Sequence, residues 1–208
     1  MSVDLKMPSS ELEGLVLPGI STIVFTEECE STQDGAKLLA RSGMPEGVLV
    51  LTRSQTGGRG RLERQWHSPR GGLYMSLLLR PLSRPDDYPA LTLKAAACIA
   101  RAAKDLYGMK TRVKEPNDVY ACDAKGNWRK LAGILTEAST CTEAGAWLVM
   151  GIGVNLSNPL SAELREKAVA VSEITGERPD VKIFLRKFFS LFQPEYAAWQ
   201  TSAASKLK

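Results

Sequence analysis

The sequence predicts an α/β domain in which a mixed or antiparallel sheet packs against helices. Residues 48–52 and 73–79 are apolar runs that follow one another without a helix between them, which indicates a hairpin. Residues 90–107 carry apolar side chains at helical spacing, and Gly108 follows where such a helix can end. With 208 residues the chain can bury one sizeable core, so we expect one domain.

The other elements are predicted from local patterns. Residues 22–25 are apolar and largely β-branched, which is typical of a strand. Ser31 can cap a helix that ends near Gly43. A hairpin tip is expected at 123–127 and a short helix over 161–168. Further strands are expected over 111–114, 119–121, 130–137 and 146–154.

The two ends of the chain differ from its middle. Residues 1–20 have a mixed composition and are expected to form an N-terminal arm. Asp180 can cap a last helix that carries aromatic residues on one face, and Pro194 is expected to kink it. The polar segment 201–208 is expected to fray.

Composition excludes several classes of protein. The hydrophobic content is 44%, the charged content is 24%, and the net charge of +4 is too small to indicate a polyanion-binding protein. No apolar run has the length of a transmembrane helix, so no membrane partner is expected. Widely spaced cysteines and a single histidine argue against zinc. These features, and a first segment without the pattern of a targeting signal, predict a cytoplasmic protein.

Residues 54–66 form the segment with the clearest chemical signal. Their glycines allow the backbone to approach a ligand closely. Arg59, Arg61 and Arg64 add fixed positive charge, and each guanidinium matches a carboxylate or phosphate in shape. The segment therefore predicts an anion-binding loop, with a solvated turn carrying surface arginines as the alternative.

Three further segments contain residues that can carry chemistry: Ser31 with Thr32, 114–118 with Lys130, and 151–155. The sequence contains no P-loop, no complete dinucleotide fingerprint and no nucleophile elbow. Lysines, arginines, and asparagine and aspartate oxygens together suit phosphate-transfer chemistry with Mg²⁺. For Asn117 and Asp118 a purely structural turn is the alternative.

Taken in order, these motifs resemble the catalytic domain of biotin protein ligases. The matching positions are Gly58-Arg59-Gly60-Arg61 with Arg64, Trp66, Ser68 and Pro69, then Lys114-x-Pro116-Asn117-Asp118, then Arg129 to Leu135 with Glu137, then Gly151 to Asn155. The resemblance covers residues 20–200 and implies a catalytic domain over 21–200. It implies the fold of class II aminoacyl-tRNA synthetases and biotin ligases, a mixed, mainly antiparallel sheet flanked by helices on one face.

The resemblance also implies an ATP-dependent ligase. The carboxylate of biotin attacks the α-phosphate of ATP and gives biotinyl-5′-AMP and pyrophosphate. A lysine of a biotin carboxyl carrier protein domain then accepts the biotinyl group. Arg61, Lys130 and Lys114 are the implied catalytic residues, because two anions have to meet and cations neutralise them.

The remaining site positions follow from the same resemblance. The implied biotin contacts are Ser31, Thr32, Gln33, Gln55, Gly58, Arg59, Gly60, Arg61, Trp66, Lys130 and Gly133. The implied nucleotide contacts are Arg59, Arg61, Trp66, Lys114, Asn117 and Asn155. Asp118 and Asn117 are implied for Mg²⁺.

The sequence departs from the family pattern at two positions. Glu115 stands where the family usually has tryptophan, which weakens the positive potential beside Lys114. Glu63 stands where glycine is usual, which predicts a differently built loop if the backbone needs glycine there. The sequence shows neither an N-terminal helix-turn-helix, so no DNA partner is expected, nor a small β-domain after residue 200.

Two alternatives stay open at this point. One is a lipoate or octanoate protein ligase or transferase of the same superfamily, and the other is a non-catalytic protein that binds biotin or its adenylate. The sequence allows a homodimer and does not exclude an organelle.

Overall fold

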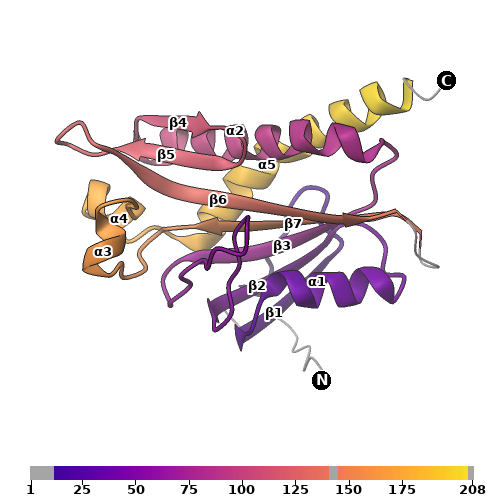
Figure 1. The fold of residues 1–208 in the computed structure, drawn as a ribbon, viewed down its shortest axis with the longest axis horizontal. Coiled ribbons are helices and arrows are strands. Elements are labelled where there is room, and N and C mark those ends of the chain that lie inside the picture. Colours follow the sequence, from indigo (N-terminus) through magenta and orange to yellow (C-terminus); the bar gives the residue numbers. More distant parts are fainter. Residues whose placement is uncertain (1–11, 141–144, 206–208) are drawn as a thin grey trace.

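The computed structural model describes residues 12–140 and 145–205. Within these residues the chain forms a seven-stranded sheet in the order β1-β2-β3-β7-β6-β5-β4 (Figure 1). The strands are β1 Thr22–Cys29, β2 Val48–Gln55, β3 Leu73–Leu79, β4 Thr111–Lys114, β5 Asp118–Cys122, β6 Trp128–Ser139 and β7 Trp147–Val154. The helices are α1 Thr32–Arg41, α2 Tyr88–Tyr107, α3 Ala162–Arg165, α4 Val171–Thr175 and α5 Val181–Ser205, with a 3₁₀ turn at Pro85–Asp87.

The sheet is mixed and mainly antiparallel, as predicted. β1 and β2 pair in parallel through the α1 crossover, and every other neighbouring pair is antiparallel. The predicted hairpin of β2 and β3 is confirmed, with Val48 opposite Leu78. β6 and β7 are the long inner strands, so the segments that contain Lys130 and Gly151 lie next to each other.

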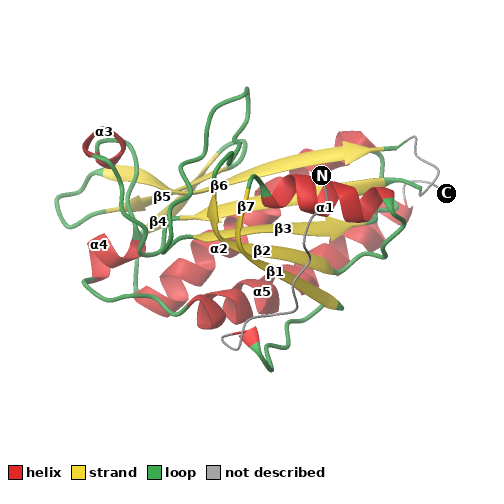
Figure 2. Cartoon of the chain, turned by 90° about the horizontal axis from the view of Figure 1, so that it is seen from below, coloured by secondary structure: helices red, strands yellow, loops and turns green. Residues whose placement is uncertain are grey.

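The two faces of the sheet are covered by different helices. Leu49 and Leu51 belong to the large core that includes α2 and α5. Val48 and Val50 point the other way, into a smaller core that includes residues of α1. α1 therefore lies on one side of the strands and α2 with α5 on the other (Figure 2). The expectation that the helices share one face was wrong, because alternate β2 residues on both faces are apolar and each face needs a cover.

The aromatic face predicted for the last helix is confirmed in α5. Phe188 and Phe192 stack with ring centres 5.4 Å apart, and Phe192 and Tyr196 follow at 6.0 Å. Asp180 caps the helix through its Oδ1, which accepts from the backbone N–H of Lys182 at 2.7 Å. α5 runs through Pro194 and continues to Ser205, beyond the point where the chain was expected to fray.

Several boundaries differ from those expected. β1 extends to Cys29, because backbone pairing with β2 carries it through a polar stretch in which Glu28 faces Ser54. The helix expected over 161–168 is limited to Ala162–Arg165, and α4 was not anticipated. At the N-terminal side, Leu12, Leu15 and Leu17 are buried in the large core. Residues 1–11, 141–144 and 206–208 lie outside the described part of the chain.

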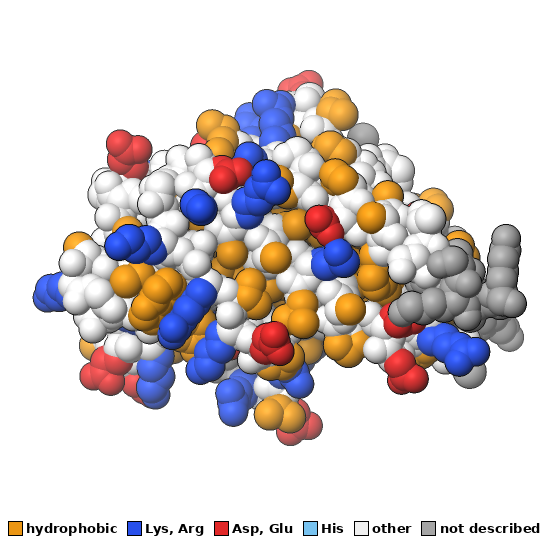
Figure 3. Space-filling model, turned by 90° about the horizontal axis from the view of Figure 1, so that it is seen from above, with side chains coloured by type: hydrophobic (Ala, Val, Ile, Leu, Met, Phe, Trp, Pro, Cys, Tyr) orange, Lys and Arg blue, Asp and Glu red, His pale blue; other side chains and the backbone are white. Residues whose placement is uncertain are grey.

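The surface mixes side chains of all kinds. On the face seen from above, basic, acidic and hydrophobic side chains are interspersed (Figure 3). Among the described residues, no helix combines the length and apolar character that crossing a membrane requires. Cys29, Cys98 and Cys122 are free thiols, and Cys141 lies outside the described residues.

Candidate active site

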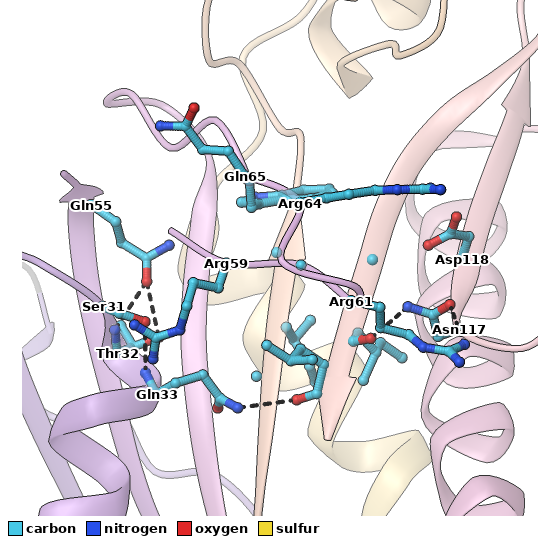
Figure 4. A pocket seen from close by; sticks show the side chains of 18 of the residues that line it. Ser31, Thr32, Gln33, Gln55, Arg59, Arg61, Arg64, Gln65, Asn117 and Asp118 are labelled. Atoms are coloured by element: carbon cyan, nitrogen blue, oxygen red, sulfur yellow. Dashed lines mark hydrogen bonds between the residues drawn. The ribbon is translucent and has the colours of Figure 1, made fainter. Parts of the chain in front are cut away.

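A pocket opens on the α1 face of the sheet, beside the N-terminal end of that helix. Its walls come from the start of α1, the loop between β2 and β3, β5, and strands β6 and β7 (Figure 4). It brings together most of the predicted site residues, namely Ser31, Thr32, Gln33, Gln55, Arg59, Gly60, Arg61, Trp66, Asn117, Asp118, Lys130 and Gly133. Gln33 and Gln55 lie on one side and Asn117 with Asp118 on the other, with Arg59 near the two glutamines and Arg61 beside Asn117.

The floor of the pocket is made by glycines of β6 and β7. Gly133 and Gly153 face each other across the two strands. A Cβ at Gly153 would overlap the indole of Trp66, and one at Gly133 would lie 3.1 Å from the same ring. A Cβ at Gly151 would lie 2.7 Å from Gln33 Oε1. The missing side chains therefore allow Trp66 and Gln33 to lie directly on the sheet.

The start of α1 supplies a network of hydrogen-bonding side chains. Gln33 Nε2 donates to Leu135 O at 3.3 Å and to Glu137 Oε2 at 2.8 Å. Gln33 Oε1 accepts from Ser76 Oγ at 2.9 Å. Ser76 Oγ lies 2.8 Å from Thr32 Oγ1. Gln33, Ser76 and Thr32 are all buried, so these bonds fix the polar groups at this end.

The same network continues into the glycine-arginine loop through Gln55. Gln55 Oε1 accepts from the backbone N–H of Thr32 at 2.9 Å, and its Nε2 donates to Ser68 Oγ at 2.8 Å. Ser68 Oγ donates to Trp66 O at 3.0 Å. Ser31 caps α1 as predicted, since its side chain accepts from the backbone N–H of Gln33. One end of the pocket is thus rigid, neutral and polar.

An ion pair attaches the loop to α1. Arg59 donates to both oxygens of Asp34, at 2.6 and 2.8 Å. This bidentate bond lowers the pKa of the Asp34 carboxyl below its usual value. Lys37 bridges Asp34 and Glu137 at 3.2 and 3.0 Å. Arg59 is therefore held at the edge of the pocket rather than aimed at its centre.

The tip of the loop contains two strained residues. Leu62 and Glu63 have φ values of 56° and 58°, in the left-handed region that favours glycine. Backbone bonds around this tip close the loop, including Gly60 N–H to Arg64 O at 2.6 Å. The loop therefore keeps a left-handed turn at position 63 although the residue there is glutamate.

Lys130 provides the charged end of the pocket. Its Nζ lies 2.7 Å from Asp118 Oδ1 and 5.2 Å from the centre of a Trp66 ring. The angles at Asp118 Oδ1 are not those of a hydrogen bond, but at this distance the two opposite charges form an ion pair. Trp66 Nε1 is buried, and no acceptor for it is found in the described residues. A cation, its counter-ion and an unused N–H donor thus lie side by side.

Asn117 lies next to this pair and connects to the loop. Its Oδ1 accepts from Arg61 at 3.3 Å, and its Nδ2 donates to Ile134 O at 2.7 Å. One carboxylate and one amide oxygen fit a Mg²⁺ ion held mainly by substrate phosphates, not one that the protein holds alone. The described residues contain no group of three or more acidic, cysteine or histidine side chains that could hold a metal.

Three predicted site residues lie outside the pocket. Lys114 is exposed on β4, with its Nζ 5.0 Å from the centre of the Tyr120 ring. Asn155 is buried beneath β6, where its side chain bonds Lys130 O and Asn158. Gly58 packs behind the loop, where a Cβ would lie 2.6 Å from Ser68 Oγ. Ligand contacts of these three residues stay predictions that this geometry does not favour.

The pocket also contains residues that were not predicted as individual ligand contacts, although Arg64 belongs to the predicted anion-binding loop and residues 151–153 to a predicted site segment. They are Arg64, Gln65, Met75, Ile134, Leu135, Gly151, Ile152 and Gly153. Strand alternation could have identified Leu135 once Gly133 was chosen, because both face the same side. Ser76 also had a signal, as a hydroxyl within the apolar strand β3 needs a buried partner.

Comparisons with known proteins agree with this geometry. Residues 26–155 match the biotin/lipoate A/B protein ligase family. The bifunctional ligase/repressor BirA of Bacillus subtilis is 32% identical over 98% of this chain and 64% of its own length. The chain therefore spans slightly less than two thirds of that relative.

For two further proteins, the match extends over a larger share of the known protein. The biotin–[acetyl-CoA-carboxylase] ligase of Paracoccus denitrificans is 34% identical over 82% of this chain and 70% of the relative. The Aquifex aeolicus biotin protein ligase, solved in complex with biotin and ATP, superposes with a TM-score of 0.75 at 28% identity, covering 88% of this chain and 74% of that one. By family match, sequence identity and fold, the chain belongs to the biotin/lipoate A/B protein ligase family.

Proposed function

We propose that the chain activates biotin with ATP as biotinyl-5′-AMP and transfers the biotinyl group to a lysine of a carrier protein domain. The observation that carries this proposal is the division of the pocket into a neutral end and a charged end. One end offers neutral hydrogen-bonding groups, and the other offers Lys130 and Arg61. Biotin has the same division, a neutral ureido head and a carboxylate at the end of an alkyl chain. The name of the Paracoccus relative, and the biotin bound in the Aquifex structure, support biotin as the substrate.

The charges of the pocket fit the first step. A carboxylate oxygen forms a bond to the α-phosphorus while the bond to the pyrophosphate oxygen breaks. Two anions repel each other before this bond forms, and Lys130 and Arg61 can lower that repulsion. Arg64 lines the same pocket and adds a third cation.

Lys130 has to exchange partners during this step. In this structure Asp118 neutralises it at 2.7 Å. A substrate carboxylate or α-phosphate would replace Asp118 as its counter-ion. Asp118 and Asn117 oxygens would then be free to meet a Mg²⁺ ion that enters with the triphosphate, which supplies charge neutralisation on the phosphates.

The second step moves the biotinyl group to the acceptor. The amine of a lysine forms an amide bond with the biotinyl carbonyl carbon, and AMP leaves. We propose a biotin carboxyl carrier protein domain as the acceptor, supported by the carboxylase in the name of the Paracoccus relative. Arg61, on the loop that borders the pocket, would retain the adenylate until the acceptor arrives.

Biotin-dependent exchange of labelled pyrophosphate into ATP tests the proposed activity. Exchange with biotin and none with lipoate or octanoate is the expected result. Exchange with lipoate alone would replace biotin by the alternative substrate. Biotin binding without exchange, in protein that melts cooperatively, would support the non-catalytic alternative. The cytoplasmic location, the homodimer and the lack of a DNA partner stay predictions from the sequence.

A further inference from the structure

The direction of each hydrogen bond at the neutral end of the pocket can be assigned from groups that only donate or only accept. A carboxylate and a carbonyl accept, a backbone N–H donates, and a hydroxyl has one proton to give. The starting point is Glu137, whose carboxylate lies at the end of the network and pairs with Lys37 at 3.0 Å.

Glu137 fixes the orientation of the Gln33 amide. The carboxylate oxygen at 2.8 Å and Leu135 O at 3.3 Å both require the NH₂ group of Gln33 on their side. Gln33 Oε1 therefore faces Ser76, and Ser76 has to give its proton to that oxygen at 2.9 Å. With its proton used, Ser76 can only accept at the 2.8 Å contact with Thr32, so Thr32 donates its hydroxyl proton there.

A second chain of bonds fixes Gln55 from the other side. Trp66 O takes the proton of Ser68, so Ser68 accepts from Gln55 Nε2 at 2.8 Å. Gln55 Oε1 therefore faces Thr32, where the backbone N–H donates to it at 2.9 Å. The Thr32 hydroxyl lies 3.3 Å from the same oxygen but has already given its proton to Ser76. Two oxygens with unused lone pairs are thus held next to each other at the pocket wall.

We infer that Glu137 and Ser76 are positioning residues that set the Thr32 hydroxyl as an acceptor and so select a ligand head that carries an N–H donor. Neither residue is needed as a direct contact, since both act through Gln33 and Thr32. A ureido head has the required N–H, whereas the dithiolane of lipoate has none. The inference rests on the proposed function and explains which acyl group this pocket prefers.

Glu137→Gln should invert the network without a large change in shape. Lys37 would draw the carbonyl of the new amide towards itself and leave its NH₂ facing the NH₂ of Gln33. Gln33 can relieve that contact by turning over, which gives up its longer 3.3 Å bond to Leu135 O, and Ser76 then gives its proton to Thr32. Thr32 then donates its own proton to Gln55 Oε1, so that the two oxygens are hydrogen-bonded to each other and no longer accept from a ligand. Ser76→Ala removes the middle of the relay and should act in the same direction.

The test is calorimetric titration of wild type, Glu137→Gln and Ser76→Ala with biotin and with the two biotins methylated at one ureido nitrogen. Wild type should prefer biotin over one methylated isomer by about 10- to 100-fold, the usual effect of a lost partner in a buried polar site. Both variants should bind biotin about 10- to 100-fold more weakly and lose this preference. The adenylation rate at saturating biotin should stay within about twofold of wild type, because the charged end is unchanged.

The matched control is Glu195→Gln, which removes a carboxylate paired with Lys94 at 2.6 Å between α2 and α5. It should bind biotin as wild type does. Unchanged biotin affinity in Glu137→Gln, or an equal loss for biotin and both methylated forms, would overturn the inference and leave the proposed function intact. A folded wild type that does not bind biotin would overturn the proposed function and the inference together.

Discussion

The two ends of the pocket are built in opposite ways. At the α1 end, Gln33, Thr32 and Ser76 are buried and joined by side-chain hydrogen bonds. At the other end, a long hydrogen bond of 3.3 Å joins Arg61 to Asn117 at an exposed position, and Lys130 pairs with one counter-ion, Asp118. The first end is preorganised, and the second contains charges whose partners can be exchanged.

This difference separates recognition from chemistry. A rigid polar wall can reject a wrong head group, because an unmatched buried group has a large free-energy cost. Charged pairs whose partners can be exchanged suit a step in which negative charge passes from the carboxylate to the leaving pyrophosphate. Substitutions at the charged end should therefore lower the rate, and substitutions at the polar end should raise KM for biotin.

Lys130→Ala should have the largest effect. Without this cation the two anions meet unscreened, so biotin-dependent pyrophosphate exchange should fall by about 1,000-fold. The thermal midpoint should change little, because the Asp118 side chain is 22% exposed and removal of the Lys130 side chain opens it further to water. Lys125→Ala, at the tip of the hairpin between β5 and β6, is the control and should exchange normally. Near-normal exchange in Lys130→Ala would contradict its catalytic assignment.

Gly151→Ala should damage the opposite end. The added Cβ would lie 2.7 Å from Gln33 Oε1, so Gln33 must move and the hydrogen-bond network must shift. We expect KM for biotin to rise about 10- to 100-fold with a smaller change in kcat. Gly35→Ala in α1 is the matched control, since its Cβ meets Val50 at an ordinary 3.5 Å. A loss confined to kcat would contradict the division between the two ends.

Arg61→Gly should release the activated intermediate. The side chain lines the pocket and is tied to Asn117 only at an exposed contact, so it is free to hold the adenylate. Losing one charged hydrogen bond corresponds to about tenfold weaker retention. Biotin labelling of an added bystander protein should rise accordingly, measured by blotting. Arg178→Gly, in an exposed loop, should not label bystanders, and equal labelling by both variants would refute the assignment.

Asp34→Asn should loosen the loop by a smaller amount. Arg59 lowers the pKa of Asp34 from 3.8, so the ion pair contributes fully above that pH and is lost as the pH falls through the lower folded-state value. At pH 7 the variant should exchange amide hydrogens of residues 57–66 about two- to fivefold faster, because the pair is partly solvated. Wild type should show constant protection from pH 5 to 9, and a titration within that range would contradict this pairing.

Glu63→Gly should have the smallest effect and the opposite sign. Glu63 has a φ of 58°, where a non-glycine residue costs about 1–2 kcal/mol, part of which glycine loses again through its unfolded-state entropy. The free energy of unfolding should rise by about 1 kcal/mol in a urea titration. Glu63→Ala keeps the Cβ and should leave stability unchanged. A destabilised glycine variant would show that the Glu63 side chain stabilises the loop.

The sequence predicted the parts of the fold that depend on local chemistry. Ser31 and Gly108 terminate their helices as expected, because capping needs only nearby residues. The hairpin of β2 and β3 followed from two apolar runs with no helix between them. The second helical layer was missed, because each residue of the continuous apolar strand β2 could face either side.

For the site, the sequence identified which residue types could contact a ligand better than it identified where their side chains lie. Asn155 lies in a motif with the right composition. It follows the last residue of β7, and its side chain donates to Lys130 O beneath the pocket. Lys114 was expected to contact phosphate, but it lies exposed on β4 and outside the pocket. Glu137 matches the family motif and Ser76 is a hydroxyl within an apolar strand, but the sequence does not show what they do, since their effect depends on a network assembled from α1, β3 and β6.

The pairing of Lys130 with Asp118 makes Asp118 an intramolecular competitor of the substrate carboxylate. Its carboxylate is tethered 2.7 Å from Lys130 Nζ, at a local concentration that a free carboxylic acid in solution cannot reach. A plain fatty acid would have to win this competition with its carboxylate alone. A molecule whose head is first held at the α1 end gains a comparable local concentration and can displace Asp118. Under the proposed function, the ion pair would set a threshold against ATP-dependent activation of acids that lack the correct head.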